Sequence, residues 1–292
     1  MFFNFMIEIK SANIHFKFII ILKKMQNKLT FNSEEITNHI KVWLKNYAIN
    51  AKVNGFVVGI SGGVDSAVTS TLCAMTGLPT ICIEMPIHQA ESHVSRGREH
   101  IEQLKKRFPN VSNMETNLTS VFEMFKSLVP SGEDNAKYQL SLANTRARLR
   151  MTTLYYHAGI HNCIVAGTGN KVEDFGVGFY TKYGDGGVDV SPIADLMKSE
   201  VYELAKFISV PNSILKAAPT DGLFGDDRSD EQQLGASYDE LEWAMIAFEN
   251  KKTIEDFTGR EAEVFAIYQR LNKNNQHKMN PIPVCIIPNE FK

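Results

Sequence analysis

A short run of small residues stands between a predicted strand and a predicted helix. The run Ser61-Gly62-Gly63-Val64-Asp65-Ser66 follows the apolar residues 56–58, and a helix-compatible stretch, residues 67–75, comes after it. Backbone N–H groups at a helix N-terminus lack partners within the helix, and the helix dipole is positive there, so this end attracts anions. Asp65 would repel such an anion unless a divalent cation lay between them. This arrangement predicts a site for a magnesium nucleotide.

The loop differs from two better-known phosphate loops. The chain has no G-x-x-x-x-G-K-[ST], and no G-x-G-x-x-G follows the strand. For S-G-G alone, a glycine turn with an Asp cap at the helix start is the simpler interpretation. The complete order of strand, S-G-G-x-D-S and helix favours nucleotide binding, and it resembles the pyrophosphate-binding loop of the N-type ATP pyrophosphatases.

Three arginines, Arg146, Arg148 and Arg150, lie on one predicted helix. Arg146 and Arg150 share a face of that helix, and Arg148 points elsewhere. Guanidinium groups bind phosphates and carboxylates through paired hydrogen bonds, so one interpretation is an anion clamp. The other is a solvated basic face.

Further charged residues follow in Gly-rich surroundings. Glu173, after the sequence G-T-G-N, could supply a second carboxylate to the metal near Asp65, or it could be an ordinary first-turn glutamate. The stretch Y-T-K-Y-G-D-G-G-V-D, residues 180–189, is too rich in glycine to be core. Lys198 begins a predicted helix, where a positive charge is unfavourable unless an anion lies nearby.

Apolar runs and turn residues predict the elements that position these groups. The predicted strands are Phe56–Ile60, Thr80–Met85, Met114–Leu118 and Cys163–Ala166. The predicted helices are a first helix capped by Asn32, then Ser66–Thr76, Ala90–Phe108, Thr119–Leu128, Leu140–His157, Lys198–Ile208, Tyr238–Asn250 and Arg260–Asn272. Alternating strands and helices predict an α/β fold, a doubly wound, mostly parallel sheet with helices on both faces.

This fold brings two of the motifs together. Ligands bind beyond the carboxyl ends of parallel strands. The first loop and Gly167-Thr168-Gly169-Asn170 both follow predicted strands directly. We therefore expect both at one crevice.

Composition narrows the class of protein. The 292 residues are 43% hydrophobic and 22% charged, as in ordinary globular proteins. A net charge of −2 gives no electrostatic case for nucleic acid or a membrane surface as a partner. The four cysteines form no C-x-x-C pair, so neither zinc binding nor dithiol chemistry is supported.

The N-terminal segment differs from the rest. Its apolar run at residues 18–22 is far shorter than a membrane span of about 20 residues, and no signal-peptide cleavage site follows. We expect residues 1–31 to be an extension outside the fold and residues 32–292 to form a single domain.

Six motifs in order extend the resemblance over residues 32–281. They are S-G-G-x-D-S, N-x-x-A-R-x-R-M, G-T-x-N-x-x-E, F-Y-T-K-Y-G-D-G-G-x-D, A-P-T and a late H-K. Together they resemble the NAD synthetases, and the fourth motif separates this family from other ATP pyrophosphatases. The resemblance implies amidation of deamido-NAD with Mg²⁺, ATP and ammonia through an adenylate, giving NAD, AMP and pyrophosphate.

The resemblance also implies roles for single residues. The implied ATP contacts are Gly59, Ile60, Ser61, Gly62, Gly63, Val64, Asp65, Ser66, Thr168, Lys198 and Thr220. The implied deamido-NAD contacts are Arg148, Lys182, Asp189, His277 and Lys278. Asp65 and Glu173 match the Mg²⁺ ligands. Lys198 is expected to stabilise the triphosphate as it is cleaved, and Asp185 is our hypothesis for the group that orients ammonia and accepts its proton.

The chain departs from the family pattern in three places. The frequent H-K-R reads His277-Lys278-Met279 here, and Gly169-Asn170-Lys171 replaces the Asp-His of some members. The segment after Glu173 also carries one extra residue. The segment before Gly59 is too short for the family's glutaminase domain and holds no Cys, so the ammonia-dependent form is implied.

Assembly and alternatives complete the expectations. The family implies a homodimer with the deamido-NAD site at the subunit interface, and we expect a cytoplasmic location. The composition of loops Pro130–Lys137 and Thr220–Glu231 suggests that they close over substrates. One alternative is a tRNA-thiolating ATP pyrophosphatase, which would need a basic surface to bind tRNA. The other is a nucleotide-binding module without turnover.

Overall fold

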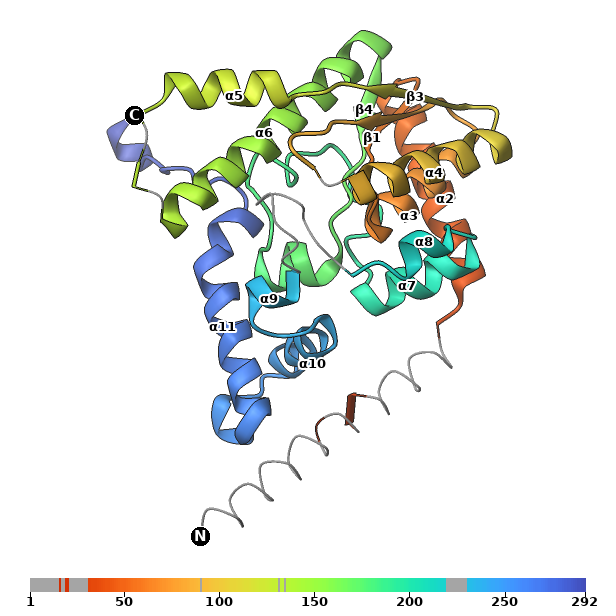
Figure 1. Ribbon diagram of the computed structural model, residues 1–292. Helices are drawn as coiled ribbons and strands as arrows, with labels where there is room; N and C mark the ends of the chain where they lie inside the picture. The colour runs from red at the N-terminus through yellow and green to blue at the C-terminus, as the bar shows by residue number, and fades with distance from the viewer. Residues whose placement is uncertain are drawn as a thin grey trace.

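The computed structural model describes Phe16, Ile19, Ile20 and residues 31–89, 91–130, 132–133, 135–218 and 230–292. These residues contain a parallel four-stranded sheet in the order β3-β2-β1-β4 (Figure 1). The strands are β1 (Gly55–Gly59), β2 (Thr80–Glu84), β3 (Val111–Glu115) and β4 (Cys163–Val165). The predicted α/β fold is confirmed.

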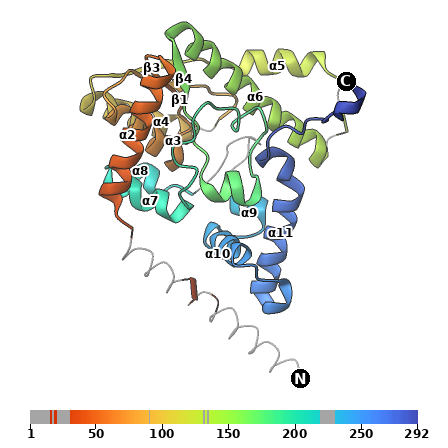
Figure 2. The ribbon, with the colours of Figure 1, turned by 180° about the vertical axis from the view of Figure 1, so that it is seen from behind.

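Helices cover both faces of the sheet (Figures 1 and 2). Phe56 and Val58 of β1 point to one face and Val57 to the other, as alternation along a strand requires. The helices packed on the first face are α2 (Ser33–Ala51), α3 (Val64–Met75), α4 (Glu91–Arg107) and α7 (Lys198–Phe207). The helices on the second face are α5 (Thr119–Leu128) and α6 (Ala136–His161).

A second core lies beside the sheet and contains none of its strands. Its elements are the π-helix η1 (Val172–Val177), α10 (Tyr238–Glu249) and α11 (Gly259–Met279). The short elements are α8 (Asn212–Leu215), α9 (Asp230–Leu234) and the 3₁₀ turns η2 (Ile254–Asp256) and η3 (Asn289–Phe291). None of the described helices is long and apolar enough to cross a membrane.

Several predicted boundaries need correction. The third strand is Val111–Glu115, not Met114–Leu118, because Val111 pairs with Thr80 while Leu118 is buried beyond the strand end. Apolar pattern misplaces this edge strand, whose middle residues Ser112 and Asn113 are exposed. α11 continues seven residues past the predicted Asn272, to Met279. His277 and Lys278 therefore lie on a helix.

Three residues of the N-terminal extension contradict its expected place outside the fold. Phe16 is 2% exposed and belongs to the second core, where its ring centroid lies 4.8 Å from that of Trp243. Ile19 and Ile20 pack against the same core. Apolar side chains lose contact with water there, which favours this packing.

The strand order determines where a ligand can bind. The chain runs outward from β1 through β2 to β3 and then returns to the other side of β1 as β4. A crevice forms at such a reversal, beyond the carboxyl ends of the strands on either side. The loop after β1 and residues 167–170 after β4 both lie there, as predicted.

Candidate active site

Residues 61–66, which lead from β1 into the first turn of α3 and are called the phosphate loop below, are held by hydrogen bonds among themselves. The Ser66 hydroxyl donates to the Gly63 carbonyl at 3.0 Å and lies 3.1 Å from the Ser61 hydroxyl. The Gly63 N–H donates to Ser61 Oγ at 3.2 Å. No side chain caps α3, because its N-cap is Gly63. Its N-terminal N–H groups are therefore oriented for an anion such as a pyrophosphate.

Gly62 is required by geometry. Its φ is +81°, and a Cβ added there would lie 2.4 Å from the carbonyl oxygen of His93 on α4. Arg96 of the same helix donates its Nε to the Gly62 carbonyl at 3.3 Å. The loop therefore packs directly against α4, which sequence reasoning did not predict.

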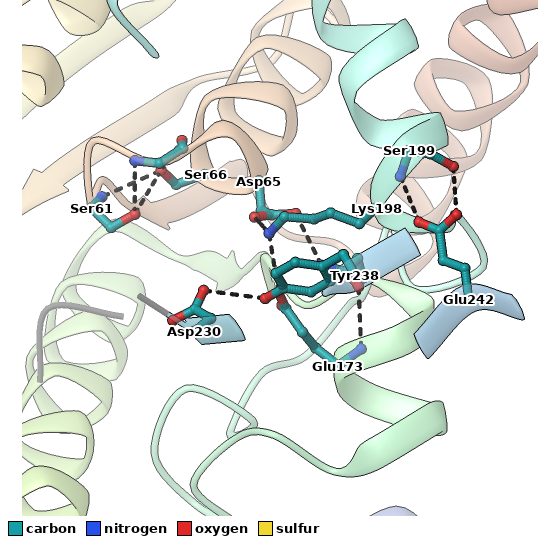
Figure 3. A network of polar contacts seen from close by, with 11 residues as sticks. Ser61, Asp65, Ser66, Glu173, Lys198, Ser199, Asp230, Tyr238 and Glu242 are labelled. Carbon is teal, nitrogen blue, oxygen red and sulfur yellow. Dashed lines mark hydrogen bonds and ion pairs between the residues drawn. The ribbon is translucent and has the colours of Figure 1, made fainter. Parts of the chain in front are cut away.

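Three charged residues predicted for the site meet in its centre (Figure 3). Lys198 Nζ lies 2.6 Å from Asp65 Oδ2 and 3.0 Å from Glu173 Oε1. Asp65 comes from α3, Glu173 from η1 and Lys198 from the start of α7. Burial alone would lower the pKa of Lys198, but the charges of Asp65 and Glu173 outweigh burial and raise that pKa. The ammonium therefore stays charged.

Asn170 ties the two carboxylate residues together. It is fully buried, and its Nδ2 donates to Asp65 Oδ1 at 3.2 Å. Its Oδ1 accepts from the backbone N–H of Glu173 at 3.2 Å. One amide thus fixes the Asp65 carboxylate and the first turn of η1. The sequence showed Asn170 only as one letter of G-T-x-N-x-x-E.

Lys198 is positioned by the cap of α7. The Ser199 N–H donates to Glu242 Oε1 at 2.8 Å, and the Ser199 hydroxyl donates to Glu242 Oε2 at 2.7 Å. Burial raises the pKa of Glu242 to about 7, although the bonds from Ser199 oppose it. A carboxylate also balances the positive end of α7. Glu242 belongs to α10, so the second core helps to position Lys198 (Figure 3).

Two neighbouring cavities lie beside this centre. The first has a cavity volume of about 130 Å³ and is lined by Gly62, Gly63, Val64, Asp65, Ser66, Glu173, Lys198, His93, Arg96 and Asp230, among others. The second has a cavity volume of about 170 Å³ and is lined by Gly59, Ile60, Met85, Arg150, Leu154 and Val188, among others. Ser61, Thr168 and Asp185 line both. The lining of the first cavity is mostly polar and suits phosphates, and the lining of the second is mostly apolar and suits an aromatic ring system.

Asp185 lies in the wall between the two cavities. Its Oδ1 accepts from the Thr181 N–H at 2.9 Å. Protein atoms around its carboxyl raise its pKa by desolvation, although the residue is exposed to solvent and hydrogen bonds from backbone N–H groups oppose the shift. Neighbouring Asp174 has its pKa raised to about 8 by burial and then by the charges of Glu173, Asp185 and Asp65. A raised pKa suits Asp185 to accepting a proton.

Four of the five predicted deamido-NAD residues gather around residues 178–183. Arg148 donates to the Lys182 carbonyl at 3.3 Å, and Lys182 Nζ donates to the His277 carbonyl. Lys278 Nζ donates to the carbonyls of Gly178 at 2.8 Å and Tyr180 at 2.7 Å. α11 therefore fastens this Gly-rich segment, and Arg148 and His277 remain exposed.

The fifth, Asp189, lies apart from that group. Its Oδ1 accepts from the Tyr155 hydroxyl at 3.0 Å, and its Oδ2 accepts from the Val165 N–H at 2.8 Å. Asp189 therefore anchors its segment to the end of β4. The remaining predicted contact, Thr220, lies outside the described residues.

Asp65 and Glu173 are suited to a magnesium ion. Both carboxylates converge on one cation, Lys198, and their side chains are only 17% and 16% exposed. The described residues contain no cluster of three or more His, Cys, Asp and Glu for a metal. Mg²⁺ in nucleotide sites commonly uses one or two carboxylates and completes its coordination with phosphates and water. The pair fits that pattern.

Comparison with known proteins assigns the chain to a family. The family model described as NAD synthase matches residues 36–282. The NH(3)-dependent NAD(+) synthetase of Carboxydothermus hydrogenoformans is 33% identical, over 85% of this chain and 95% of that protein. The enzyme of the same name from Methanosarcina mazei is 36% identical, over 86% and 97%. The chain belongs to the NAD synthase family.

Solved structures agree with this assignment. The NMN synthetase from Francisella tularensis superposes with a TM-score of 0.73 at 31% identity, covering 89% of this chain and 99% of that one. The NH3-dependent NAD synthetase from Campylobacter jejuni has the same fold, with a TM-score of 0.70 at 24% identity and coverage of 87% and 100%.

Proposed function

We propose that this protein catalyses the ATP-dependent amidation of deamido-NAD with ammonia. The observation that carries the proposal is the meeting of Asp65, Glu173 and Lys198 at the uncapped N-terminus of α3, in a chain of the NAD synthase family. This arrangement suits cleavage of ATP between its α and β phosphates. The nicotinate carboxylate takes the AMP group, and ammonia then displaces AMP.

Each group has a role in this series of reaction steps. The loop N–H groups at α3 bind the departing pyrophosphate. Asp65 and Glu173 would hold Mg²⁺, which neutralises developing charge on the phosphates when bound. Lys198 stabilises the same charge. Asp185 accepts a proton from ammonia as its nitrogen attacks the acyl carbon and the bond to AMP breaks.

The name of one structural neighbour supports a second candidate substrate. The Francisella tularensis protein is named an NMN synthetase, so it differs from NAD synthetases in its named product. The same groups here could amidate the mononucleotide, because the reacting carboxylate would be the same. Relative rates on deamido-NAD and nicotinate mononucleotide distinguish the two activities.

An assay of the purified full chain tests the proposal. With ATP, Mg²⁺, deamido-NAD and ammonium, we expect NAD and AMP to form in equal amounts. Glutamine in place of ammonium should give no NAD. AMP without NAD would point to another acceptor, such as a tRNA, and an absence of AMP formation would contradict the enzymatic role.

We also propose a homodimer, formed through α5 and the C-terminal segment that follows α11. α5 exposes one apolar face, made of Val121, Met124, Phe125 and Leu128. The C-terminal segment ends near α5 in both views and exposes Ile282, Val284, Ile286 and Phe291 (Figures 1 and 2). An apolar surface of this extent is typical of a subunit interface. The cytoplasmic location remains a prediction.

A further inference from the structure

Tyr238 reaches the acid pair from the second core. It is the first residue of α10, and only 4% of it is exposed. The Ser237 N–H donates to Glu240 Oε2 at 2.9 Å, and the Glu240 N–H donates to Ser237 Oγ at 3.3 Å. This reciprocal capping fixes the start of the helix. The tyrosine ring therefore has a defined position.

The Tyr238 hydroxyl points at the groups proposed to bind the metal (Figure 3). It donates to Glu173 Oε1 at 2.5 Å and lies 3.1 Å from Asp230 Oδ2. A phenol has a single proton to donate, so the shorter contact identifies Glu173 as its main acceptor. Lys198 Nζ also lies 4.6 Å from the centroid of the ring, within the range of a cation–π interaction.

We propose that Tyr238 is a positioning residue for the metal site and acts through Glu173. Its hydroxyl directs the Glu173 carboxylate toward Asp65, and its ring faces the Lys198 ammonium in the free protein. This inference rests on the proposed function, since it assumes a divalent cation at the acid pair.

The other contacts leave this task to Tyr238. Asn170 binds the carboxylate of Asp65 but only the backbone N–H of Glu173. Lys198 binds Glu173 Oε1, yet it must release part of this contact when it turns to the phosphates of ATP. In the described part of the chain, the Tyr238 hydroxyl is then the donor that keeps the Glu173 carboxylate in place. Mutation of a residue that holds a metal ligand in this way commonly lowers metal affinity by about 10-fold or more.

Tyr238→Phe tests the proposal, because it removes the hydroxyl and keeps the ring. The measurement is Mn²⁺ binding by electron paramagnetic resonance, with α,β-methylene-ATP present and no deamido-NAD. We expect the Kd for Mn²⁺ to rise about 10-fold. Tyr268→Phe is the matched control, since Tyr268 is buried in the same core at 1% exposure and packs against Phe248. It should leave the Kd unchanged.

A double-mutant cycle separates positioning from a general loss of structure. If Tyr238 acts through Glu173, Tyr238→Phe should have little further effect on the Kd in a Glu173→Gln background. An equal penalty in both backgrounds, or a wild-type Kd for Tyr238→Phe, would overturn the proposal. A wild-type chain that binds no Mn²⁺ with the analogue would overturn the metal site of the proposed function, and this inference with it.

Discussion

At the scale of single residues, the site is held together by opposite charges that the substrates must rearrange. Lys198 is 5% exposed on its side chain and neutralises two carboxylates. A buried charge left without its partner is strongly unfavourable. Each of the three residues therefore stabilises the others in the free protein, and the same cation lies where it can meet the triphosphate.

Lys198→Met should impair both catalysis and folding. We expect the rate of AMP formation to fall at least about 100-fold, because a charge-stabilising donor is lost. The free energy of unfolding should fall by about 3 kcal/mol, because Asp65 and Glu173 lose their counter-ion. Initial rates and urea unfolding measure the two effects. Lys206→Met, on an exposed lysine of the same helix, is the control and should change neither.

Asp185→Asn tests the proton acceptor. We expect kcat to fall by about 100-fold or more, the usual contribution of a general base, while ATP binding stays near the wild-type value. The rate of NAD formation is measured against ammonium concentration. An unchanged rate with unchanged ammonia dependence would exclude the proposed role.

Residues of the site were predictable from sequence when the backbone itself makes the site. Hydrogen bonds within the loop Gly59–Ser66 set its anion-binding geometry, so the local sequence is enough to predict an anion site there. Tyr238 and Glu242 gave no comparable signal, because they follow an ordinary helix cap and reach the site only through packing of the second core. Contacts of this kind depend on tertiary structure, which local pattern does not encode.

At the scale of elements, the contact between the phosphate loop and α4 makes Gly62 a sensitive position. Gly62→Ala should weaken ATP binding at least about 10-fold, since its Cβ would meet the His93 carbonyl and displace loop or helix. Gly77→Ala is the matched control. Gly77 has φ +78° and nothing within 4 Å of an added Cβ, so an alanine there would introduce backbone strain but no steric clash. It should cost about 1 kcal/mol of stability and no ATP affinity, as measured by calorimetry.

The packing of α3 on α4 should depend on pH through His100. This fully buried residue lies 2.8 Å from the Ser70 hydroxyl, and burial, with a smaller effect of Arg107, lowers its pKa to about 4. The unfolded chain, with a histidine pKa near 6.5, binds the proton first on acidification. His100 therefore stabilises the fold fully above about pH 6.5, and this contribution is lost toward pH 4.

A comparison of unfolding free energies in this window tests the role of His100. We expect the wild type to lose about 3 kcal/mol more than His100→Gln between pH 6.5 and 4, from about 1.4 kcal/mol per pKa unit. Urea unfolding at several pH values provides the measurement. Parallel curves for the two proteins would contradict the assignment.

Element boundaries were predicted well where a cap or an apolar pattern sets them. Asn32 does accept the Glu35 N–H at 3.2 Å, as a helix cap should. The sequence did not predict the π-helix η1, because residues 172–177 have no helical apolar period. Packing against α10 and α11 holds this helix in place. Such π-helical turns commonly occur at functional sites, and this one presents Glu173.

At the scale of the whole molecule, one apolar surface is left uncovered by the residues that the structure describes. The four exposed apolar residues of α5 are spaced i, i+3, i+4 and i+7, which places them on one face, while Phe122 is buried on the other. Single exposed apolar residues are common, but a helix face joined by an exposed apolar C-terminal segment is not. A second copy of the chain would bury both.

Met124→Glu should therefore dissociate the dimer that we propose. Met124 is 62% exposed at the middle of the α5 face, and a charge there would have to be buried without a partner. Sedimentation velocity at micromolar concentration should show the wild type as a dimer and this variant as a monomer. Phe207→Glu, at a 50% exposed position on α7, is the control and should remain dimeric. A wild type that sediments as a monomer, or an unaffected Met124→Glu dimer, would exclude α5 as the interface.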